Sequence, residues 1–422
     1  MDKKVYLFDI KDATLFNPIA ETRPVFNLLC GIYSYFNRIE QSSKIEKVDG
    51  LIVRQKLIEI TRAAYQAQEV NRIAKADKTI FINGLAALSE SDLARILDTQ
   101  EKVIFHNGED IIAMIVDYED ICEIADAQDS CEFYLDDLEL LEFGQHLEMD
   151  IRIPKGIWDL PLMTGAQIID DFLDLLSNNK RIKTLKDNSF DNYEIRVVVP
   201  ERIVLGSNVK IEPFVLLDAT DGPIIIGDNA EISAGSQLRG PLYIGNDCKI
   251  VNARISGGCS FGPVSRMGGE IEQSIVQGYS NKYHDGFLGH SYLGKWVNLG
   301  AMTTNSDLKN NYGDIKYGIS ETEVFNTGSM KVGAFLGDHA KTGIGTLINS
   351  GTNIGVGCNL YGGGMGPKYL KPFSWGSGSD GFVEYKIDKA IETAEKVASR
   401  RNLKLHDAEI NLLREIHRKY WS

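Results

Sequence analysis

The chain has 422 residues, of which 43% are hydrophobic, 9% aromatic and 25% charged, and its formal net charge is -14. This length predicts two or three domains with sizeable cores. The acidic balance argues against a nucleic-acid-binding surface, and no run reaches the roughly 18 apolar residues that a membrane span requires. Six cysteines without a Cys-x-x-Cys pair predict free thiols in a reducing compartment. The apolar run at the N-terminus is too short for a signal peptide, so we expect a cytoplasmic protein.

Residues 1–180 are predicted to form an α/β domain in which short strands alternate with helices. Apolar runs beside turn residues predict strands at 5–8, 50–53, 79–84, 102–108 and 111–116. Helical spacing predicts helices at 25–39, 89–97 and 160–176, the second with a serine cap. The polar run 177–191 predicts a linker to the next domain.

From residue 195 glycine becomes frequent and an aliphatic residue recurs at every sixth position. One run comprises Ile226, Ile232, Leu238, Ile244 and Ile250, and a second comprises Leu336, Thr342, Ile348, Ile354 and Leu360. One inward residue in every six is typical of a coil with three flat faces and about eighteen residues per turn. The pattern therefore predicts a left-handed parallel β-helix over 195–376. It weakens between 251 and 330, where we expect two inserts, at 264–280 and 303–327.

After residue 380 the apolar spacing becomes helical. Two amphipathic helices are predicted within 381–422, the first around Ile387 and Ile391 and the second around Leu413 and Ile416. Because the last coil of a solenoid needs a polar cover, we expect these helices to cap the open end of the β-helix.

The candidate site is the polar, glycine-rich stretch 280–290. His284 is the candidate catalytic base, since acyl transfer to an amine needs a group that takes a proton from the attacking nitrogen near neutral pH. Asp285 or Glu270 could orient its imidazole, and backbone amides of nearby glycines could stabilise an oxyanion. The alternative is a histidine that only forms a hydrogen bond across a turn.

Further polar residues around His284 are candidates for substrate contacts. Lys282 and Lys309 are candidate partners of a phosphate group, and Asp285 is a third candidate substrate contact. Asn281 and Asn305 are candidates for hydrogen bonds to sugar hydroxyls. A solvated rim for the lysines and turn formation for the asparagines remain open as alternatives.

Two other functions stay open on the residues alone. His284, His290 and His339 would form a zinc site if they met, which would make the β-helix a metal enzyme of the carbonic anhydrase type. Spacing along one coil places the first two histidines on adjacent faces, so they would meet only across a subunit interface. The second alternative is a non-catalytic sensor of sugar nucleotides, or a scaffold, because the turn at 9–14 lacks the glycines that let a backbone approach phosphates.

The motifs resemble the GlmU family, whose members combine UDP-N-acetylglucosamine pyrophosphorylase and glucosamine-1-phosphate N-acetyltransferase domains, and more closely a divergent bacterial group of it. The resemblance covers nearly the whole chain and is carried by 268–272, 280–289, 296–301 and 306–313. It implies that His284 is the base, that acetyl-CoA is the donor, and that the protein is a homotrimer with sites between subunits. It also implies Mg²⁺ if residues 1–180 transfer a uridylyl group, with Arg23 as the candidate nucleotide-binding residue.

Several positions depart from the pattern of this family. Glu272 stands where the relatives carry a lysine that binds the sugar phosphate, and Met302 replaces a glycine. The glycine-rich Gly-x-Gly-Thr-Arg loop of the nucleotidyltransferase domain is missing, and only 17–24 resembles the end of that signature. The resemblance therefore leaves the acceptor sugar open, together with the activity of the N-terminal domain.

Overall fold

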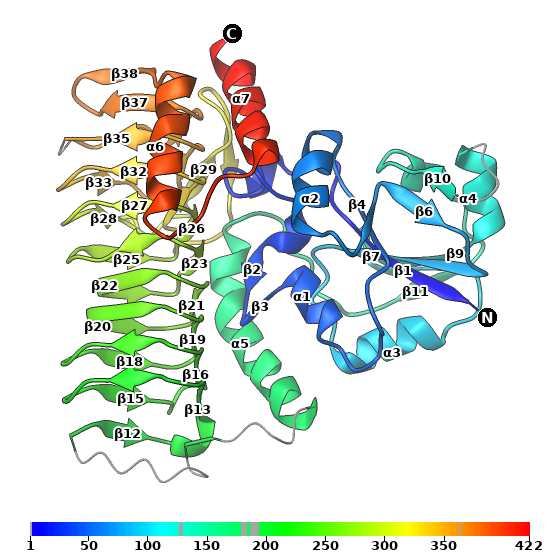
Figure 1. Ribbon diagram of the computed structural model, residues 1–422, viewed down its shortest axis with the longest axis horizontal. Helices are drawn as coiled ribbons and strands as arrows, with labels where there is room; N and C mark the ends of the chain where they lie inside the picture. Colours follow the sequence, from blue (N-terminus) through cyan, green and yellow to red (C-terminus); the bar gives the residue numbers. More distant parts are fainter. Residues whose placement is uncertain (1, 126–129, 179–183, 186–193, 363) are drawn as a thin grey trace.

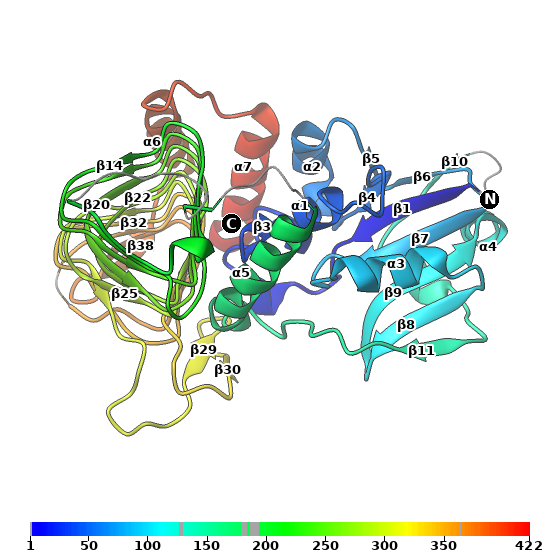
Figure 2. The same cartoon turned by 90° about the horizontal axis from the view of Figure 1, so that it is seen from below.

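The computed structural model describes residues 2–125, 130–178, 184–185, 194–362 and 364–422. Two parts lie side by side, an α/β part and a tall stack of short strands (Figure 1). Helices α5 (Asp159–Asn178) and α7 (Asp407–Trp421) lie between them in both views (Figures 1 and 2). Among the described residues, no helix is long and apolar enough to cross a bilayer.

The α/β part is built on a seven-stranded mixed sheet with the order β11-β8-β9-β7-β1-β4-β5. Strand β1 pairs in parallel with β4 and β7, whereas β9 is antiparallel to β7 and β8. All five predicted strands are present. The bounds are β1 (Lys3–Phe8), β4 (Gly50–Ile52), β5 (Glu69–Val70), β7 (Lys78–Asn83), β8 (Val103–Asn107), β9 (Asp110–Asp117) and β11 (His146–Glu148). The predicted helix at 89–97 is α3 (Glu90–Asp98), capped by Ser89.

The prediction of one helix over 25–39 is wrong. A single 3-10 turn is followed by a small hairpin of β2 (Leu29–Cys30) and β3 (Tyr33–Ser34), and only then by α1 (Tyr35–Glu40). The hairpin turns at Gly31, whose φ of +80° suits glycine. The amide of Leu29 donates to the hydroxyl of Tyr292 in the β-helix at 2.8 Å. A contact from far along the chain thus replaces the local helix.

Helix α5 confirms the helix predicted at 160–176 and joins the two parts. Ile168 and Phe172 are buried with Val204 and Ile225 of the β-helix. On the other side, Asp171 accepts hydrogen bonds from the Arg38 guanidinium at 2.9 and 3.0 Å. A buried carboxylate is stable only when it is paired in this way. The exposed Ile169, expected on the same apolar face, lies outside this contact.

The stack is a left-handed parallel β-helix, as the sixfold pattern predicts. In its nine-stranded sheet, one buried apolar residue of each coil pairs with the corresponding residue of the next coil. These residues form a continuous apolar column. Fully burying such a side chain contributes about 1.5–3 kcal/mol. The column runs through Ile226, Ile244, Phe261, Val276, Leu293, Leu336, Ile354 and Leu370. The strands of this sheet are β13 (Ile203–Leu205), β16 (Ile224–Ile226), β19 (Leu242–Ile244), β21 (Cys259–Phe261), β23 (Ile275–Gly278), β26 (Tyr292–Lys295), β31 (Ala334–Leu336), β34 (Thr352–Ile354) and β36 (Tyr369–Leu370).

The insert predicted at 264–280 is wrong, because these residues form an ordinary coil. Strand β22 (Arg266–Glu272) pairs on one side with β20 (Lys249–Ser256) and on the other with both β24 (Asn281–Lys282) and β25 (Phe287–Gly289). Each of the two long strands therefore continues through a corner of the coil, with a register shift in the first of them. The step along the apolar column shortens to 15 residues, from position 261 to 276, and this shortening breaks the sixfold pattern.

The insert predicted at 303–327 is present. The column step from Leu293 to Leu336 spans 43 residues, 336 minus 293, and Leu308 still bridges to Lys331. The insert carries a hairpin of β29 (Lys316–Gly318) and β30 (Val324–Asn326). The ring of Phe325 in this hairpin stacks on that of Trp158, with centroids 5.3 Å apart. The insert therefore packs against the α/β part.

The C-terminal helices lie beside the β-helix and not across its end, contrary to the expected cap (Figure 1). The final coil instead ends in an antiparallel hairpin of β37 (Ser374–Ser377) and β38 (Gly381–Glu384). Helix α6 (Ile387–Ser399) runs along the coils. Helix α7 packs against α2 (Ile58–Ala64) of the α/β part.

Candidate active site

His284 lies at a corner of a regular coil, between β24 (Asn281–Lys282) and β25 (Phe287–Gly289). Its side chain is exposed. The imidazole stands edge to face with the ring of Tyr283, with centroids 5.3 Å apart. Within the described part of the chain no hydrogen bond or ion pair engages either ring nitrogen. The site thus holds an exposed histidine whose ring nitrogens have no partner among the described residues.

Lys282 supports this corner from inside the coil. Its side chain is buried, and Nζ donates to the carbonyl oxygen of Gly268 at 2.9 Å and to that of His284 at 2.6 Å. Burial lowers the pKa of Lys282 to about 8. A Cβ on Gly269, whose φ is +72°, would lie 2.8 Å from this ammonium. Lys282 therefore holds the loop of His284 and does not reach a phosphate at the surface.

A cavity of about 500 Å³ opens beside His284 and is unusually basic for an acidic chain. Four cationic side chains line it: Arg266, Lys341, Arg400 and Arg401. Burial lowers the pKa of Lys341 to about 8, and the pKa of Arg401 is lowered by burial and then by the two neighbouring arginines. Clustered cations that depress one another's pKa are suited to bind phosphate groups.

Asn281 connects the predicted site with these cations. Its Oδ1 accepts a hydrogen bond from Nη2 of Arg401 at 3.3 Å, and its Nδ2 donates to Oδ1 of Asn298 at 3.2 Å. The Nε atom of Arg401 is buried without a partner among the described residues. Asn281 thus fixes an arginine that keeps an unused donor. Of the predicted site residues, Asn281 and His284 line this cavity together.

The other predicted substrate contacts lie elsewhere. Asn305 is buried and pairs with both backbone groups of Gly289, at 2.9 and 3.0 Å. Lys309 donates to the carbonyl oxygen of Asp314 within the insert. Asp285 is exposed on the loop of His284. Asn305 therefore replaces a strand partner, and Lys309 does not line the cavity.

The face beyond His284 carries paired charges on the long strand β22. Glu270 accepts from Arg254 at 2.7 Å, so it does not orient the imidazole in this arrangement. Glu272, where the relatives carry a lysine, faces Lys331 of the insert at 3.3 Å. The ammonium of Lys331 thus lies next to position 272, although Lys331 comes from the insert and not from β22.

The three histidines of the metal hypothesis have separate surroundings in one chain. His290 pairs with Asp307 at 2.8 Å and His339 with Glu409 at 3.2 Å, whereas His284 is exposed. Across the described ranges no three His, Cys, Asp or Glu side chains form a group that suits a metal ion.

In the α/β part, the end of β1 is occupied by ion pairs. Asp9 accepts from Nε of Arg54 at 2.7 Å, and Glu21 pairs with Lys56 at 3.1 Å. Arg23, the predicted nucleotide contact, is buried in an ion pair with Asp338 of the β-helix. Asp9 and Glu21 are thus held by basic side chains, and these two carboxylates do not fit a Mg²⁺ site in this arrangement.

Sequence reasoning missed the cations that make the cavity. The adjacent Arg400 and Arg401 follow α6 directly, and a basic pair at the end of a helix in a chain of net charge -14 was the available signal. Lys341 and Arg266 carried no such signal, since each lies singly on a coil.

Residues 5–180 match the sugar nucleotidyl transferase family. A bifunctional sugar-1-phosphate nucleotidylyltransferase/acetyltransferase of Sulfurisphaera tokodaii is 26% identical over 230 residues, which cover 48% of this chain and 52% of that protein. The bifunctional protein GlmU of Carboxydothermus hydrogenoformans is 22% identical over 340 residues, 74% of this chain and 65% of that protein. The first of these comparisons spans about half the length of the relative.

Among solved structures, a UDP-N-acetylglucosamine acyltransferase from Campylobacter jejuni is similar over 53% of this chain and 93% of that chain, at 15% identity and a TM-score of 0.31. Residues 5–180 are therefore similar to the sugar nucleotidyl transferase family, and most of the chain is similar, at low identity, to a bifunctional GlmU protein.

Proposed function

We propose that the β-helix transfers an acetyl group from acetyl-CoA to the amine of a sugar phosphate, with His284 as the base. The observation that carries this proposal is an exposed histidine without a partner, among the described residues, at the mouth of a basic cavity. The name of the archaeal relative, which includes an acetyltransferase, supports the same reaction. In this proposal Arg400, Arg401 and Lys341 bind the phosphate groups of coenzyme A.

The proposed reaction needs one proton acceptor. The amine nitrogen attacks the thioester carbon, a nitrogen–carbon bond forms, and the carbon–sulfur bond breaks. His284 takes the proton from the nitrogen and passes it to the departing thiolate, so that coenzyme A leaves as a thiol. Such general-base help is worth roughly a hundred- to ten-thousand-fold in rate. Lys282 keeps the imidazole in place through the carbonyl of His284.

The acceptor is proposed to lie on the β22 face. There Glu270 and Glu272 offer carboxylates for the amine, and Lys331 offers a cation for the phosphate. In this proposal the lysine of the relatives is replaced by Lys331 of the insert, and Asp285 remains a candidate contact at the edge.

We further propose a division of labour and an assembly. Residues 1–180 form the nucleotidyltransferase-like domain, 195–376 the acyltransferase domain, and 381–422 the helices that complete the basic cavity. A cytoplasmic homotrimer would place each His284 near a neighbouring chain. Light scattering of the purified protein tests the assembly.

Transfer of a uridylyl group by residues 1–180 is a second candidate, favoured by the family match. The ion pairs of Asp9 and Glu21 oppose it, because they occupy the end of β1. Formation of UDP-N-acetylglucosamine from UTP and N-acetylglucosamine-1-phosphate by the full chain, with Mg²⁺ present, tests this activity. Absence of product would leave acetyl transfer as the chain's one proposed reaction.

The test of acetyl transfer is thiol release from acetyl-CoA with a panel of amino-sugar phosphates and their unphosphorylated forms. We expect His284→Ala to lower kcat at least about a hundredfold. His146→Ala, a change of an exposed histidine in β11, is the matched control and should keep full turnover. Equal turnover in wild type and His284→Ala would refute the role of this histidine, and no turnover with any acceptor would refute the substrate class.

A further inference from the structure

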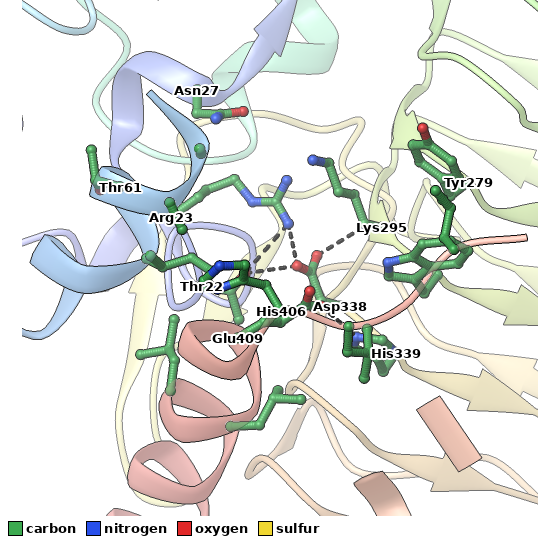
Figure 3. A pocket seen from close by; sticks show the side chains of 18 of the residues that line it. Thr22, Arg23, Asn27, Thr61, Tyr279, Lys295, Asp338, His339, His406 and Glu409 are labelled. Atoms are coloured by element: carbon green, nitrogen blue, oxygen red, sulfur yellow. Dashed lines mark hydrogen bonds and ion pairs between the residues drawn. The ribbon is translucent and has the colours of Figure 1, made fainter. Parts of the chain in front are cut away.

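A second cavity of about 330 Å³ lies between the α/β part, the β-helix and the start of α7 (Figure 3). Each of the three units contributes to it: Thr22, Arg23 and Asn27 from the first, Lys295 and Trp296 from the second, and Leu405 from the segment before α7. Neither the His284 site nor the end of β1 accounts for it. A cavity shared by three units is a common place for small ligands.

The charge inside this cavity is not balanced. Both carboxylate oxygens of Asp338 are used, Oδ1 by the amide of Lys295 at 2.8 Å and Oδ2 by Arg23 and Thr22. The Lys295 ammonium points into the cavity beside the Arg23 guanidinium (Figure 3). Across the described residues it has no hydrogen bond or ion pair. The second carboxylate of the lining, Glu409, contacts His339 at 3.2 Å and not Lys295. Two cations therefore stand together, and the ammonium of Lys295 has no contact partner among the described residues.

The lining of this cavity also contains a buried ring nitrogen without a hydrogen-bond partner among the described residues. His339 is 5% exposed; its Nε2 contacts Glu409 at 3.2 Å, and its Nδ1 is buried without a partner among the described residues. A buried polar atom that stays unsatisfied is unfavourable for the folded chain. Burial, and then the nearby Arg23, lower the pKa of Lys295. An anion in the cavity would relieve the repulsion and offer oxygens to these groups.

Part of the lining is apolar and aromatic. Trp296 lies against Tyr279 with ring centroids 4.7 Å apart and stacks on His339 at 6.4 Å. Ile60 and Leu405 also line the cavity. A ligand that fits both walls combines an anionic group with a ring that packs on apolar side chains.

We propose that this cavity binds a small phosphorylated metabolite, with its phosphate between Lys295 and Arg23 and its ring against Trp296. The ligand would contact both the α/β part and the β-helix. Binding would therefore stabilise the folded chain by linkage and report the occupancy of one part to the other. This site is separate from the His284 cavity and does not depend on acetyl transfer.

The test uses the full chain and calorimetric titration with three phosphorylated probes, inorganic phosphate, glucosamine-1-phosphate and UTP, and with uridine and glucosamine as unphosphorylated controls. We expect at least one phosphorylated probe to bind, and Lys295→Met to weaken it by roughly tenfold or more, because a hydrogen bond to a charged group is lost. Lys295→Arg should retain binding, which separates charge from folding.

Two further variants locate the effect. Lys368→Met removes a partly buried lysine whose Nζ donates to Ser350 at 2.7 Å and should leave the affinity unchanged. Arg414→Gln removes a surface arginine that is paired with Asp388 and should also leave the affinity unchanged. Failure of all three phosphorylated probes to bind, or equal affinity in wild type and a folded Lys295→Met variant, would overturn the proposal.

Discussion

The two cavities stand on either side of one aromatic wall, because Tyr279 and Trp296 line both. Both contain more cations than their surroundings neutralise. They differ in their histidines: His284 is exposed and unpaired within the described chain, whereas in the second cavity His339 is buried against Glu409 and Nδ1 of His406 accepts from the amide of Ala408. The comparison teaches that basic charge marks a place for an anion, and that only an uncommitted, accessible histidine adds proton transfer to it. One cavity is thus suited to chemistry and the other to binding.

The largest difference between the cavities should appear when the support of His284 is removed. Lys282→Met deletes the two hydrogen bonds that hold the loop. We expect kcat to fall by roughly 10- to 100-fold, because small displacements of a catalytic group are costly, while KM changes little. Steady-state kinetics with acetyl-CoA measure this.

The same Lys282→Met variant should leave phosphate binding at Lys295 as it is in wild type. A fall in both kcat and phosphate affinity would mean that the substitution disturbs the whole β-helix. The two cavities would then not be independent of each other. Circular dichroism and the melting temperature show which of the two has occurred.

The next difference concerns the phosphates of the donor. Arg400→Gln and Arg401→Gln should each raise the KM for acetyl-CoA about tenfold, the value of one charge-assisted hydrogen bond, and keep kcat within about twofold. Arg414→Gln, which removes an arginine paired with Asp388 on the surface, is the matched control. An acetylated pantetheine without phosphates should react equally with all of them. If the variants also lose activity with that donor, the arginines do not act on phosphate.

A smaller effect follows from the buried ammonium of Lys282. Its pKa is about 8 in the folded chain against an ordinary 10.5, so between these values the unfolded chain binds a proton that the folded chain has released. The free energy of unfolding therefore rises with pH between these two values. Below about pH 8 the ammonium is charged in both states, and its burial lowers the free energy of unfolding by a constant amount. We expect wild type to gain on the order of 1 kcal/mol relative to Lys282→Met between about pH 7 and about pH 10. Urea unfolding at several pH values measures the difference, and parallel curves for the two proteins would contradict the buried charge.

The β-helix was predictable because its core is local in sequence. Ile226 and Ile244 differ by one coil and pair directly, so each aliphatic step in the sequence is also a contact. The cavity beside His284 was not, because Arg401 meets Asn281 across 120 positions and no periodicity links them. The failure at 25–39 has the same origin, since Leu29 is bonded to Tyr292. The burial of Lys282 was not predicted, because a charged side chain is expected at the surface. It is possible here because Gly269, which has no side chain, leaves room for the lysine inside the coil.

The smallest effect is expected at the wall that the cavities share. Trp296 is 8% exposed and lies between Tyr279 and His339, so Trp296→Phe keeps an aromatic ring but shortens the wall on both sides. We expect a two- to threefold rise in the KM for acetyl-CoA and a similar loss of phosphate affinity, each worth about 0.5 kcal/mol. Trp375→Phe, at a ring that is 41% exposed and lines neither cavity, should change neither. A loss confined to one ligand would show that Trp296 belongs to that site alone, and a loss in neither would mean that both ligands avoid the wall. Equal small losses would instead fit two sites that differ in chemistry and share one structural element.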